Sequence, residues 1–227
     1  MKKLLTFVAT SAILLGLAGC SSTPAANTET NAESPAVTET TEVTVETTEE
    51  VIEEGYVYVP YTPTGDLTLL DDFEDGLFWT FVGDSWNDGD CSTGADLTEE
   101  WGSSGPNSLK CSFRSVGSGK WEKGGYVCEG ASLIEQDWSG AKMILFDVNN
   151  PNDFDIEVMF VSQAGENWDA WNQTGSFKCP AKSVTPVYFN ISGHRNLEIV
   201  NRAIIYIAGN DAPTDGYFMV DNVQLEF

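Results

Sequence analysis

The sequence has few of the residues that catalysis and nucleic-acid binding require. Its 227 residues include one histidine, His194, and only 11 lysine and arginine residues against 35 aspartate and glutamate residues. The formal charge of −24 repels phosphate groups, which disfavours binding to nucleic acids and to anionic lipid headgroups. A single histidine excludes a histidine-rich metal site and leaves little scope for histidine acid–base chemistry. His194 lies in Ser-Gly-His-Arg-Asn, which is typical of a turn.

Short motifs of enzymes are also missing. The sequence has no Cys-x-x-Cys pair, no Gly-x-Ser-x-Gly elbow, no phosphate-binding loop and no dinucleotide fingerprint. A pair of carboxylates suited to glycoside hydrolysis carries no information, because some such pair is always found in so acidic a chain. The sequence therefore gives little support to an enzyme.

The first 20 residues predict an export signal that ends in a lipid anchor. Met1-Lys2-Lys3 is basic, residues 4–17 are apolar, and Leu17-Ala18-Gly19-Cys20 follows. The apolar run is shorter than the roughly 20 residues that cross a bilayer as a helix. The arrangement resembles the lipobox of bacterial lipoproteins, which implies a diacylated Cys20 and a protein anchored at the extracellular face of the cell membrane. The alternative is an ordinary signal peptide with an incidental cysteine.

Residues 21–66 predict a disordered linker rich in threonine and glutamate. This stretch has nine glutamates and one aspartate but no lysine or arginine. Repulsion between like charges and β-branched threonines both favour an extended chain over a helix. The segment Tyr56–Tyr61 either docks on the following domain or belongs to the linker, and the linker interpretation is favoured.

Residues 67–227 predict one all-β domain. Short apolar runs alternate with clusters of glycine, asparagine, aspartate and proline, and no helical period appears. Leu109–Phe113 and Phe154–Val158 alternate in polarity, whereas Met143–Phe146 and Ala203–Ile207 are apolar throughout, as in central strands covered on both faces. We expect an antiparallel two-sheet β-sandwich of jelly-roll type.

Four motifs in this region resemble a known family. They are Leu70-Asp-Asp-Phe-Glu-Asp-Gly76 with Trp79, Gly105-Pro-Asn-Ser-Leu-Lys110, Asp137-Trp-Ser-Gly140 before Met143-Ile-Leu-Phe-Asp147, and Tyr217-Phe-Met-Val-Asp-Asn-Val-Gln-Leu225. Together they resemble the jelly-roll carbohydrate-binding modules of bacterial glycan-degrading systems, which are galactose-binding-domain-like sandwiches. The acidic insertion from Asp84 to Glu100 departs from the family pattern. The resemblance implies a non-catalytic domain that binds polysaccharide.

Asp221 leads to the prediction of a structural calcium ion. Strict alternation along the last strand places Asp221 on the same face as Tyr217, Met219, Val223, Leu225 and Phe227. A carboxylate buried there needs a cation or several hydrogen-bond donors, and calcium accepts carboxylates together with backbone carbonyls. The family resemblance implies Glu74 and Asp221 as calcium ligands, helped by Asn107 and Asp72. The alternative is that backbone N–H groups or an arginine satisfy Asp221, or that it lies in water at a strand end.

Aromatic residues among polar ones predict the sugar-binding surface. Sugar rings stack on tryptophan and tyrosine, while amides and carboxylates bond the hydroxyl groups. The strongest cluster is Glu166–Gln173, a polar loop in which two tryptophans lie three residues apart. The predicted ligand contacts are Trp168, Asp169, Trp171, Asn172 and Gln173, with Trp121 at a turn and Tyr206 on a sheet face opposite the core. Packing within loops is the competing interpretation for these tryptophans, whereas Trp79 and Trp138 are expected in the core.

The four cysteines after Cys20 leave two interpretations open. If residues 108–115 and 125–129 form a hairpin, Cys111 and Cys128 lie opposite one another and a disulfide is plausible. Because Cys111 shares a face with Leu109 and Phe113, a free buried thiol is the alternative.

These observations predict a monomeric, lipid-anchored surface protein whose one folded domain binds polysaccharide. Two alternatives belong to other classes of protein. One is a small exported enzyme that acts on glycans, and the other is a cell-envelope adhesion module with a protein partner.

Overall fold

The structure, a computed structural model, describes residues 58–82, 91–115, 123–133, 135–208 and 212–227. The predictions for Cys20, for residues 21–57 of the linker and for Trp121 lie outside these residues. Among the described residues, no helix is long and apolar enough to cross a membrane. The described chain consists of twelve strands and one short 3-10 turn, Gly130–Ser132.

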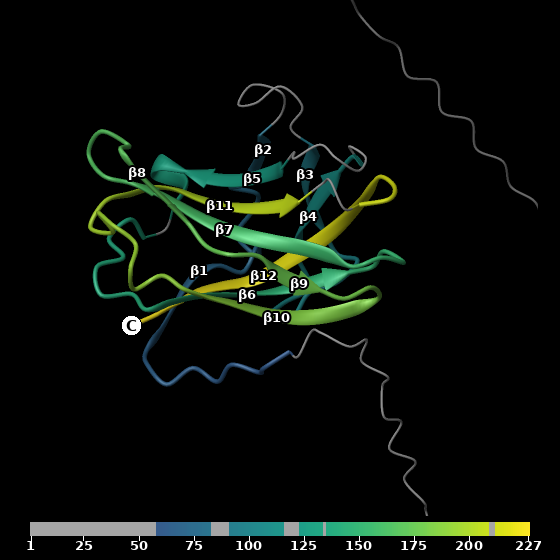
Figure 1. Cartoon of the computed structure of the whole chain (residues 1–227), viewed down its shortest axis with the longest axis horizontal. Helices are drawn as coiled ribbons and strands as arrows, with labels where there is room; N and C mark the ends of the chain where they lie inside the picture. The colour runs from purple at the N-terminus through teal and green to yellow at the C-terminus, as the bar shows by residue number, and fades with distance from the viewer. Residues whose placement is uncertain (1–57, 83–90, 116–122, 134, 209–211) are drawn as a thin grey trace, which may run out of the picture. The chain divides into compact units, whose positions relative to one another are not determined.

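Two antiparallel six-stranded sheets form a sandwich (Figure 1). The β12 sheet has the order β10-β6-β12-β4-β3 with β1 beside β12, and the β11 sheet has the order β2-β5-β11-β7-β8 with β9 beside β7. The β12 sheet contains β1 (Leu67–Asp71), β3 (Ser92–Thr98), β4 (Ser108–Phe113), β6 (Met143–Asn150), β10 (Ser183–Asn190) and β12 (Gly216–Glu226). The β11 sheet contains β2 (Thr80–Val82), β5 (Lys123–Glu129), β7 (Ile156–Ala164), β8 (Ala170–Gln173), β9 (Phe177–Cys179) and β11 (Val200–Ala208). The predicted all-β sandwich is confirmed.

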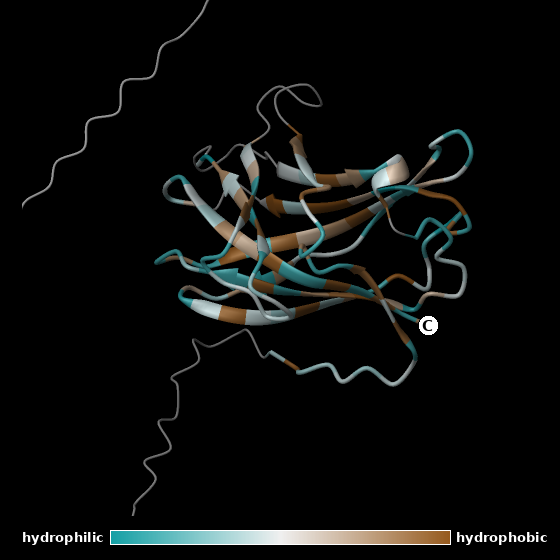
Figure 2. Cartoon of the chain, turned by 180° about the vertical axis from the view of Figure 1, so that it is seen from behind, coloured by the Kyte–Doolittle hydropathy of each residue, from teal (hydrophilic) through white to brown (hydrophobic). Residues whose placement is uncertain are grey.

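Aromatic side chains fill the space between the two sheets. Tyr126 of β5 meets Phe218 of β12 edge to face with ring centroids 5.4 Å apart, which joins one sheet to the other. Trp138 stacks on Phe160 of β7 at 6.2 Å and is fully buried, as is Tyr126. Trp79 is also buried, so the core positions predicted for it and for Trp138 are confirmed. Burial of each such side chain contributes about 1.5–3 kcal/mol. Bands of opposite hydropathy alternate along the strands (Figure 2).

A β-bulge in β12 corrects the predicted face of Asp221. The register with β6 shifts between Asp221 and Gln224, and Asn222 has a φ of 57°. Phe218 and Val220 face the core before the bulge, and Val223 and Leu225 face it afterwards. The extra residue reverses the alternation, so strict alternation along the whole strand was wrong. Asp221 lies on the outer face of the β12 sheet and is buried there.

A segment that the sequence assigned to the linker is docked on the domain. We call Tyr58–Gly65 the N-terminal clasp; it runs along β10 to the end of β12 (Figure 1). Tyr61 stacks on Tyr188 with ring centroids 5.0 Å apart, and the Tyr188 hydroxyl donates to the Val59 carbonyl at 2.6 Å. The linker interpretation of Tyr58–Tyr61 was therefore wrong, and the packed domain begins before Leu67.

The carboxylate of Glu226 holds the other end of the clasp. It accepts hydrogen bonds from the Tyr61 hydroxyl at 2.5 Å and from the backbone N–H groups of Thr64 and Gly65 at 2.8 Å each. Burial alone would raise the pKa of Glu226, but these hydrogen bonds outweigh it and hold the pKa below its usual range. The clasp thus depends on an ionised Glu226.

The four cysteines of the folded domain are buried thiols. Cys91, Cys111, Cys128 and Cys179 form no disulfide. Cys111 lies in β4 and Cys128 in β5, and these strands belong to different sheets, so the hairpin on which a Cys111–Cys128 bridge depended does not form. Burial raises the pKa of the Cys128 thiol to about 12 and that of Cys111 well above its usual value. This is the buried-thiol alternative, in which cysteine acts as a small apolar residue.

Candidate functional site

The outer face of the β11 sheet carries a second apolar cluster, separate from the core. Its members are Val82, Val127, Met159, Val161, Ile204 and Tyr206. Because β11 also buries Ala203, Ile205 and Ile207 on its inner face, the strand is apolar on both sides, as the sequence indicated. Tyr206 lies on the face opposite the core, where the sequence placed it.

Two tryptophan rings are exposed, and each rests on a side chain of β11. Trp168 is 40% exposed and Trp171 is 44% exposed. The Trp171 ring contacts Tyr206 with centroids 6.4 Å apart, and the Trp168 ring lies over the guanidinium of Arg202 at 4.5 Å. Tyr206 itself is only 6% exposed, so it supports Trp171 rather than presenting its own ring.

The β7–β8 hairpin positions both tryptophans. Its strands pair Gln163 with Trp171. Across the turn, the backbone N–H of Trp168 donates to the Gly165 carbonyl at 3.0 Å. Gly165 has a φ of 93°, a conformation that side chains rarely adopt, and a Cβ there would press on the Asp169 carboxylate and the Asn196 amide, so another residue would be strained.

Trp168 has a strained backbone. Its φ of 61° falls in the left-handed region, which bulky side chains rarely adopt. Such a conformation costs about 1–3 kcal/mol and persists only where the surroundings impose it. The turn therefore fixes the backbone of Trp168 at a cost in stability.

Alternation along β8 separates the polar residues predicted as ligand contacts. Gln173 is exposed on the same face as Trp171, and Asp169 is exposed at the start of the strand. Asn172 points inward and is 7% exposed. Its side chain accepts from the Arg195 N–H at 2.9 Å and donates to the Arg195 carbonyl at 3.0 Å. Asn172 thus ties the hairpin to a neighbouring loop, which corrects its predicted place among the sugar contacts.

Ser162 and His194 form the one polar pair that resembles catalytic residues among the described side chains. Ser162 Oγ lies 2.9 Å from His194 Nδ1, and Asn172 Nδ2 donates to Ser162 Oγ at 3.3 Å. Ser162 is fully buried, so its hydroxyl is closed to an external substrate. Partial burial lowers the pKa of His194 and favours the neutral ring. The pair serves to hold the loop that contains His194.

Arg202 and Gln163 were missed by the sequence analysis. Arg202 Nε donates to the Glu129 carboxylate, and Arg202 Nη1 donates to Gln163 Oε1 at 3.3 Å. Gln163 Nε2 in turn donates to the Trp168 carbonyl at 3.2 Å. The alternation along β11 could have revealed Arg202, because it lies four residues before Tyr206 and therefore points to the same face of the sheet.

The residues predicted to bind calcium divide into two groups. The Asp221 carboxylate accepts from the N–H groups of Ser103 at 2.6 Å and Ser104 at 2.8 Å, and from the Ser104 hydroxyl at 2.9 Å. The Glu74 carboxylate accepts from the backbone and side-chain N–H groups of Asn107, at 2.9 and 2.8 Å. Both carboxylates hold the loop formed by residues 101–107, which joins β3 to β4.

This arrangement fits the alternative to calcium. Backbone N–H groups satisfy Asp221, as the sequence analysis allowed, and Asp72 accepts from the Glu74 N–H at 3.2 Å. In the described part of the chain, no three His, Cys, Asp or Glu side chains gather closely enough to hold a metal ion. The calcium site stays a prediction from the family resemblance.

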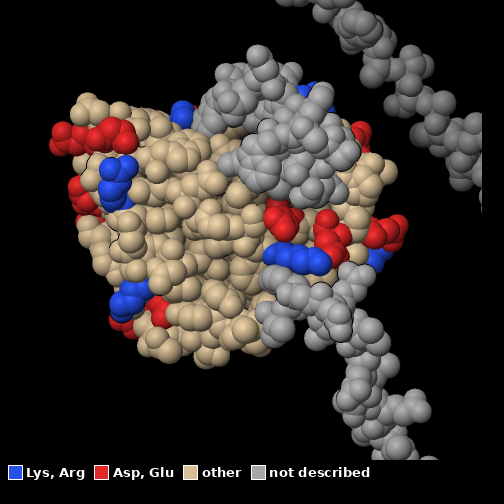
Figure 3. Space-filling model, viewed as in Figure 1, with Lys and Arg blue, Asp and Glu red and all other residues tan. Residues whose placement is uncertain are grey.

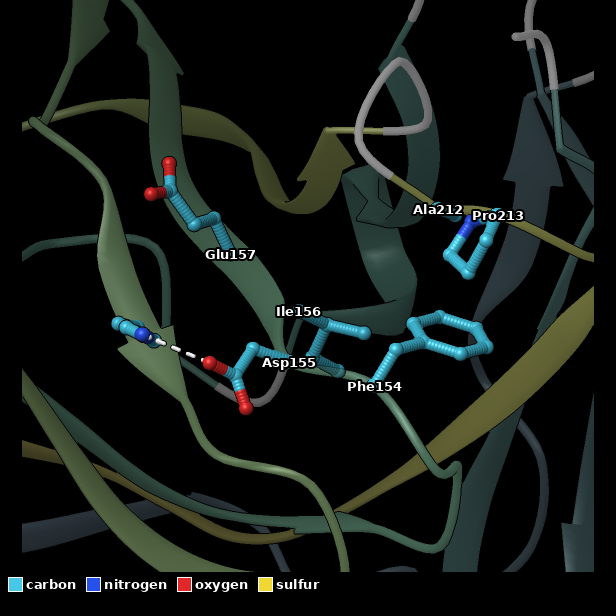
Figure 4. Close-up of a pocket in the computed structure, with 7 residues that line it drawn as sticks. Phe154, Asp155, Ile156, Glu157, Ala212 and Pro213 are labelled. Atoms are coloured by element: carbon cyan, nitrogen blue, oxygen red, sulfur yellow. Dashed lines mark ion pairs between the residues drawn. The ribbon is translucent and has the colours of Figure 1, made fainter. Parts of the chain in front are cut away.

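A recess of about 420 Å³ lies at the opposite end of β7 from the tryptophans (Figure 4). It is lined by Phe154, Asp155, Ile156, Glu157, Lys178, Ala212 and Pro213. Asp155 turns toward Lys178, with which it pairs at 2.7 Å, and it also accepts from the Ala181 N–H. The hydrogen bond from Lys178 holds the pKa of Asp155 below its usual range. Because Asp155 and Lys178 are paired with each other and the one ring, Phe154, is only partly exposed, the recess is a weaker candidate than the tryptophan surface.

Charged side chains lie mostly at the periphery of the face seen in Figure 3, and basic groups lie beside acidic ones. Lys182 pairs with Asp153 at 3.0 Å, and Arg202 pairs with Glu129. Between the peripheral charged groups, this face presents a broad surface without charged side chains (Figure 3), which suits an uncharged ligand.

Comparisons with known proteins place this fold among carbohydrate-binding structures. No protein-family model matches the chain, and no curated protein matches it either. The family 11 carbohydrate-binding module from Clostridium thermocellum, solved with a β-1,3-1,4-mixed-linked tetrasaccharide, is 20% identical with a TM-score of 0.51. That match covers 70% of this chain and 95% of the module. The chain has the fold of a carbohydrate-binding module.

Two further solved structures support the same fold. CBM27-1 of Caldicellulosiruptor saccharolyticus, in complex with mannohexaose, is 20% identical with a TM-score of 0.53 over 71% of this chain and 97% of its own. CBM28, a module specific for non-crystalline cellulose, is 19% identical with a TM-score of 0.51 over 75% of this chain and 100% of its own. The predicted likeness to carbohydrate-binding β-sandwiches is thereby confirmed at the level of the fold.

Proposed function

We propose that this domain is a non-catalytic module that binds polysaccharide on the outer face of the β11 sheet. The observation that carries the proposal is the pair of exposed rings, Trp168 and Trp171, each fixed from below by a side chain of β11. We further propose, from the sequence of residues 1–20, that a lipid on Cys20 displays the module at the cell surface.

Exposed, immobilised rings suit the recognition of sugars. The C–H faces of a sugar ring pack on an aromatic face, and the contact gains most when the aromatic ring is already ordered. Trp168 is ordered by its turn and by Arg202, and Trp171 by strand β8 and Tyr206. Little conformational entropy is then lost when the ligand binds.

Polar groups beside the rings can bond the hydroxyl groups of the ligand. Gln173 and Asp169 are exposed on the hairpin that carries the tryptophans. The overall charge of −24 repels anionic chains, so the ligand class that fits is a neutral polysaccharide.

Retardation in native gels that contain soluble polysaccharides tests the proposal. The purified protein should be slowed by at least one neutral polysaccharide, and Trp171→Ala should abolish that retardation. Leu97→Ala is the matched control, because Leu97 is 39% exposed but lies in β3 of the other sheet. Retardation lost equally in both variants, or absent in a folded wild-type protein across a broad panel, would refute the proposal and favour a protein partner.

A further inference from the structure

We infer that Arg202 is a positioning residue that fixes the Trp168 ring in its sugar-binding orientation. This inference rests on the proposed function, and it adds a residue to which no role in binding has been assigned. Arg202 lies over one side of the Trp168 ring at 4.5 Å, while 40% of the tryptophan surface stays open to solvent. One side of the ring is therefore a support and the rest is available to a ligand.

Trp168 needs such a support more than Trp171 does. Trp171 belongs to a regular strand, whose pairing with β7 sets its direction. Trp168 lies in the turn before that strand with a left-handed φ of 61°, so no strand pairing sets the direction of its ring. Without a partner beneath it, the ring would be free to turn into water or to fold onto the apolar cluster of the sheet.

Arg202 is itself held from two neighbouring strands. Glu129 of β5 accepts from its Nε, and Gln163 of β7 accepts from its Nη1 at 3.3 Å. Gln163 also binds the Trp168 carbonyl at 3.2 Å, so the same side chain ties the turn and the guanidinium together. Three strands thus fix the plane of the guanidinium, and the guanidinium fixes the ring.

Arginine has properties here that lysine lacks. A planar guanidinium stacks on an aromatic face while its N–H groups donate in the plane to two separate acceptors. A lysine ammonium keeps the charge, but it has no plane to stack on the ring and cannot donate in one plane to two separate acceptors. Arg202→Lys therefore separates orientation of the ring from simple positive charge.

A double-mutant cycle separates positioning from direct contact with sugar. Arg202→Lys should weaken binding of the polysaccharide that retards the wild-type protein on the order of tenfold. In a Trp168→Ala background, Arg202→Lys should weaken polysaccharide binding no further. An equal loss in both backgrounds would show that Arg202 contacts the sugar or supports the whole fold, and no loss in either would show that it does not position Trp168. Both outcomes overturn the inference.

Acrylamide quenching of tryptophan fluorescence provides a readout without ligand. Arg202→Lys should increase quenching of the full-length protein, and the increase should vanish when Trp168 is replaced by Phe. Arg195→Lys is the matched control, because it makes the same change at an exposed arginine in a neighbouring loop. If no polysaccharide binds the wild-type protein, the proposed function fails. Independently of that result, quenching that is unchanged by Arg202→Lys overturns the positioning role.

Discussion

The two outer faces of the sandwich both bear aromatic rings, but only one is covered by the described chain itself. On the β12 sheet, the clasp stacks Tyr61 on Tyr188, and the loop of residues 101–107 covers Asp221. On the β11 sheet, Trp168 and Trp171 stay about 40% exposed or more. The first face uses ring stacking and carboxylate hydrogen bonds to bind segments of its own chain. The second face exposes its stacking rings to solvent, which is why we assign the external ligand to it.

The largest effect should follow removal of both exposed rings. Trp168→Ala combined with Trp171→Ala should weaken polysaccharide binding about thirtyfold or more, since stacked aromatic contacts are each worth about 1–3 kcal/mol. The unfolding temperature should change little, because both side chains are at least 40% exposed. Calorimetric titration and thermal melting measure the two quantities. A double variant that binds like the wild type would refute the assignment of this face.

Removal of Asp221 should open the covered face. Asp221→Ala leaves the N–H groups of Ser103 and Ser104 without their acceptor, which should cost about 2–3 kcal/mol of unfolding free energy. Polysaccharide affinity should be unchanged, because the two faces are separate. Denaturant unfolding measures the loss.

The same experiment decides between hydrogen bonds and calcium as the partner of Asp221. On the hydrogen-bond account, a chelator leaves the melting temperature of the wild-type protein unchanged. A melting temperature that falls in chelator and recovers with calcium, but not in Asp221→Ala, would contradict this account and restore the predicted metal site.

Release of the clasp should have a smaller effect on stability. Glu226→Gln removes the charge that orders Tyr61, Thr64 and Gly65, and should cost about 1–2 kcal/mol. Chymotrypsin should then cut within the clasp earlier than in the wild type, while sugar binding stays intact. The matched control is Glu157→Gln, an acidic residue of β7 distant in sequence from the clasp. Equal cleavage of the two variants would contradict the role of Glu226.

The smallest effect should be a pH dependence from His194. Its folded pKa lies below the unfolded value of about 6.5, so the neutral ring contributes stability that is present above that pH. This contribution is lost as the pH falls through the folded pKa, and because the ring is partly exposed the loss should be under about 1 kcal/mol. Unfolding at pH 7.5 and 5, compared with His194→Gln, isolates it. A wild-type protein that is stabilised at the lower pH relative to the variant would contradict the placement of His194.

Strand patterns predicted the fold, because alternation is a local property. It placed Tyr206 opposite the core, whereas Trp171 was expected in a polar loop and lies in strand β8. The same reasoning failed where the pairing of distant strands decides which way a side chain points or which sheet a strand joins. The bulge after Asp221 depends on the register with β6, and the separation of Cys111 from Cys128 depends on which sheet each strand joins.

The clasp and Arg202 were missed for a related reason. Nothing near Tyr61 in the sequence reveals Glu226, which is 165 residues away and accepts its hydroxyl. Likewise, Arg202 gains its role from Glu129 and Trp168, which come from different strands and turns. A sequence shows which residues are able to stack or pair, whereas the fold selects the partner.

The most direct test of the account is an NMR titration of the ¹⁵N-labelled protein with a soluble neutral polysaccharide that it binds. The tryptophan indole N–H signals, assigned by Trp→Phe variants, report on each ring separately. We predict that the signals of Trp168 and Trp171 shift together, while those of buried Trp79 and Trp138 and the amide signals of the clasp stay in place. Shifts confined to the clasp and β10, with both exposed tryptophans unchanged, would contradict the account.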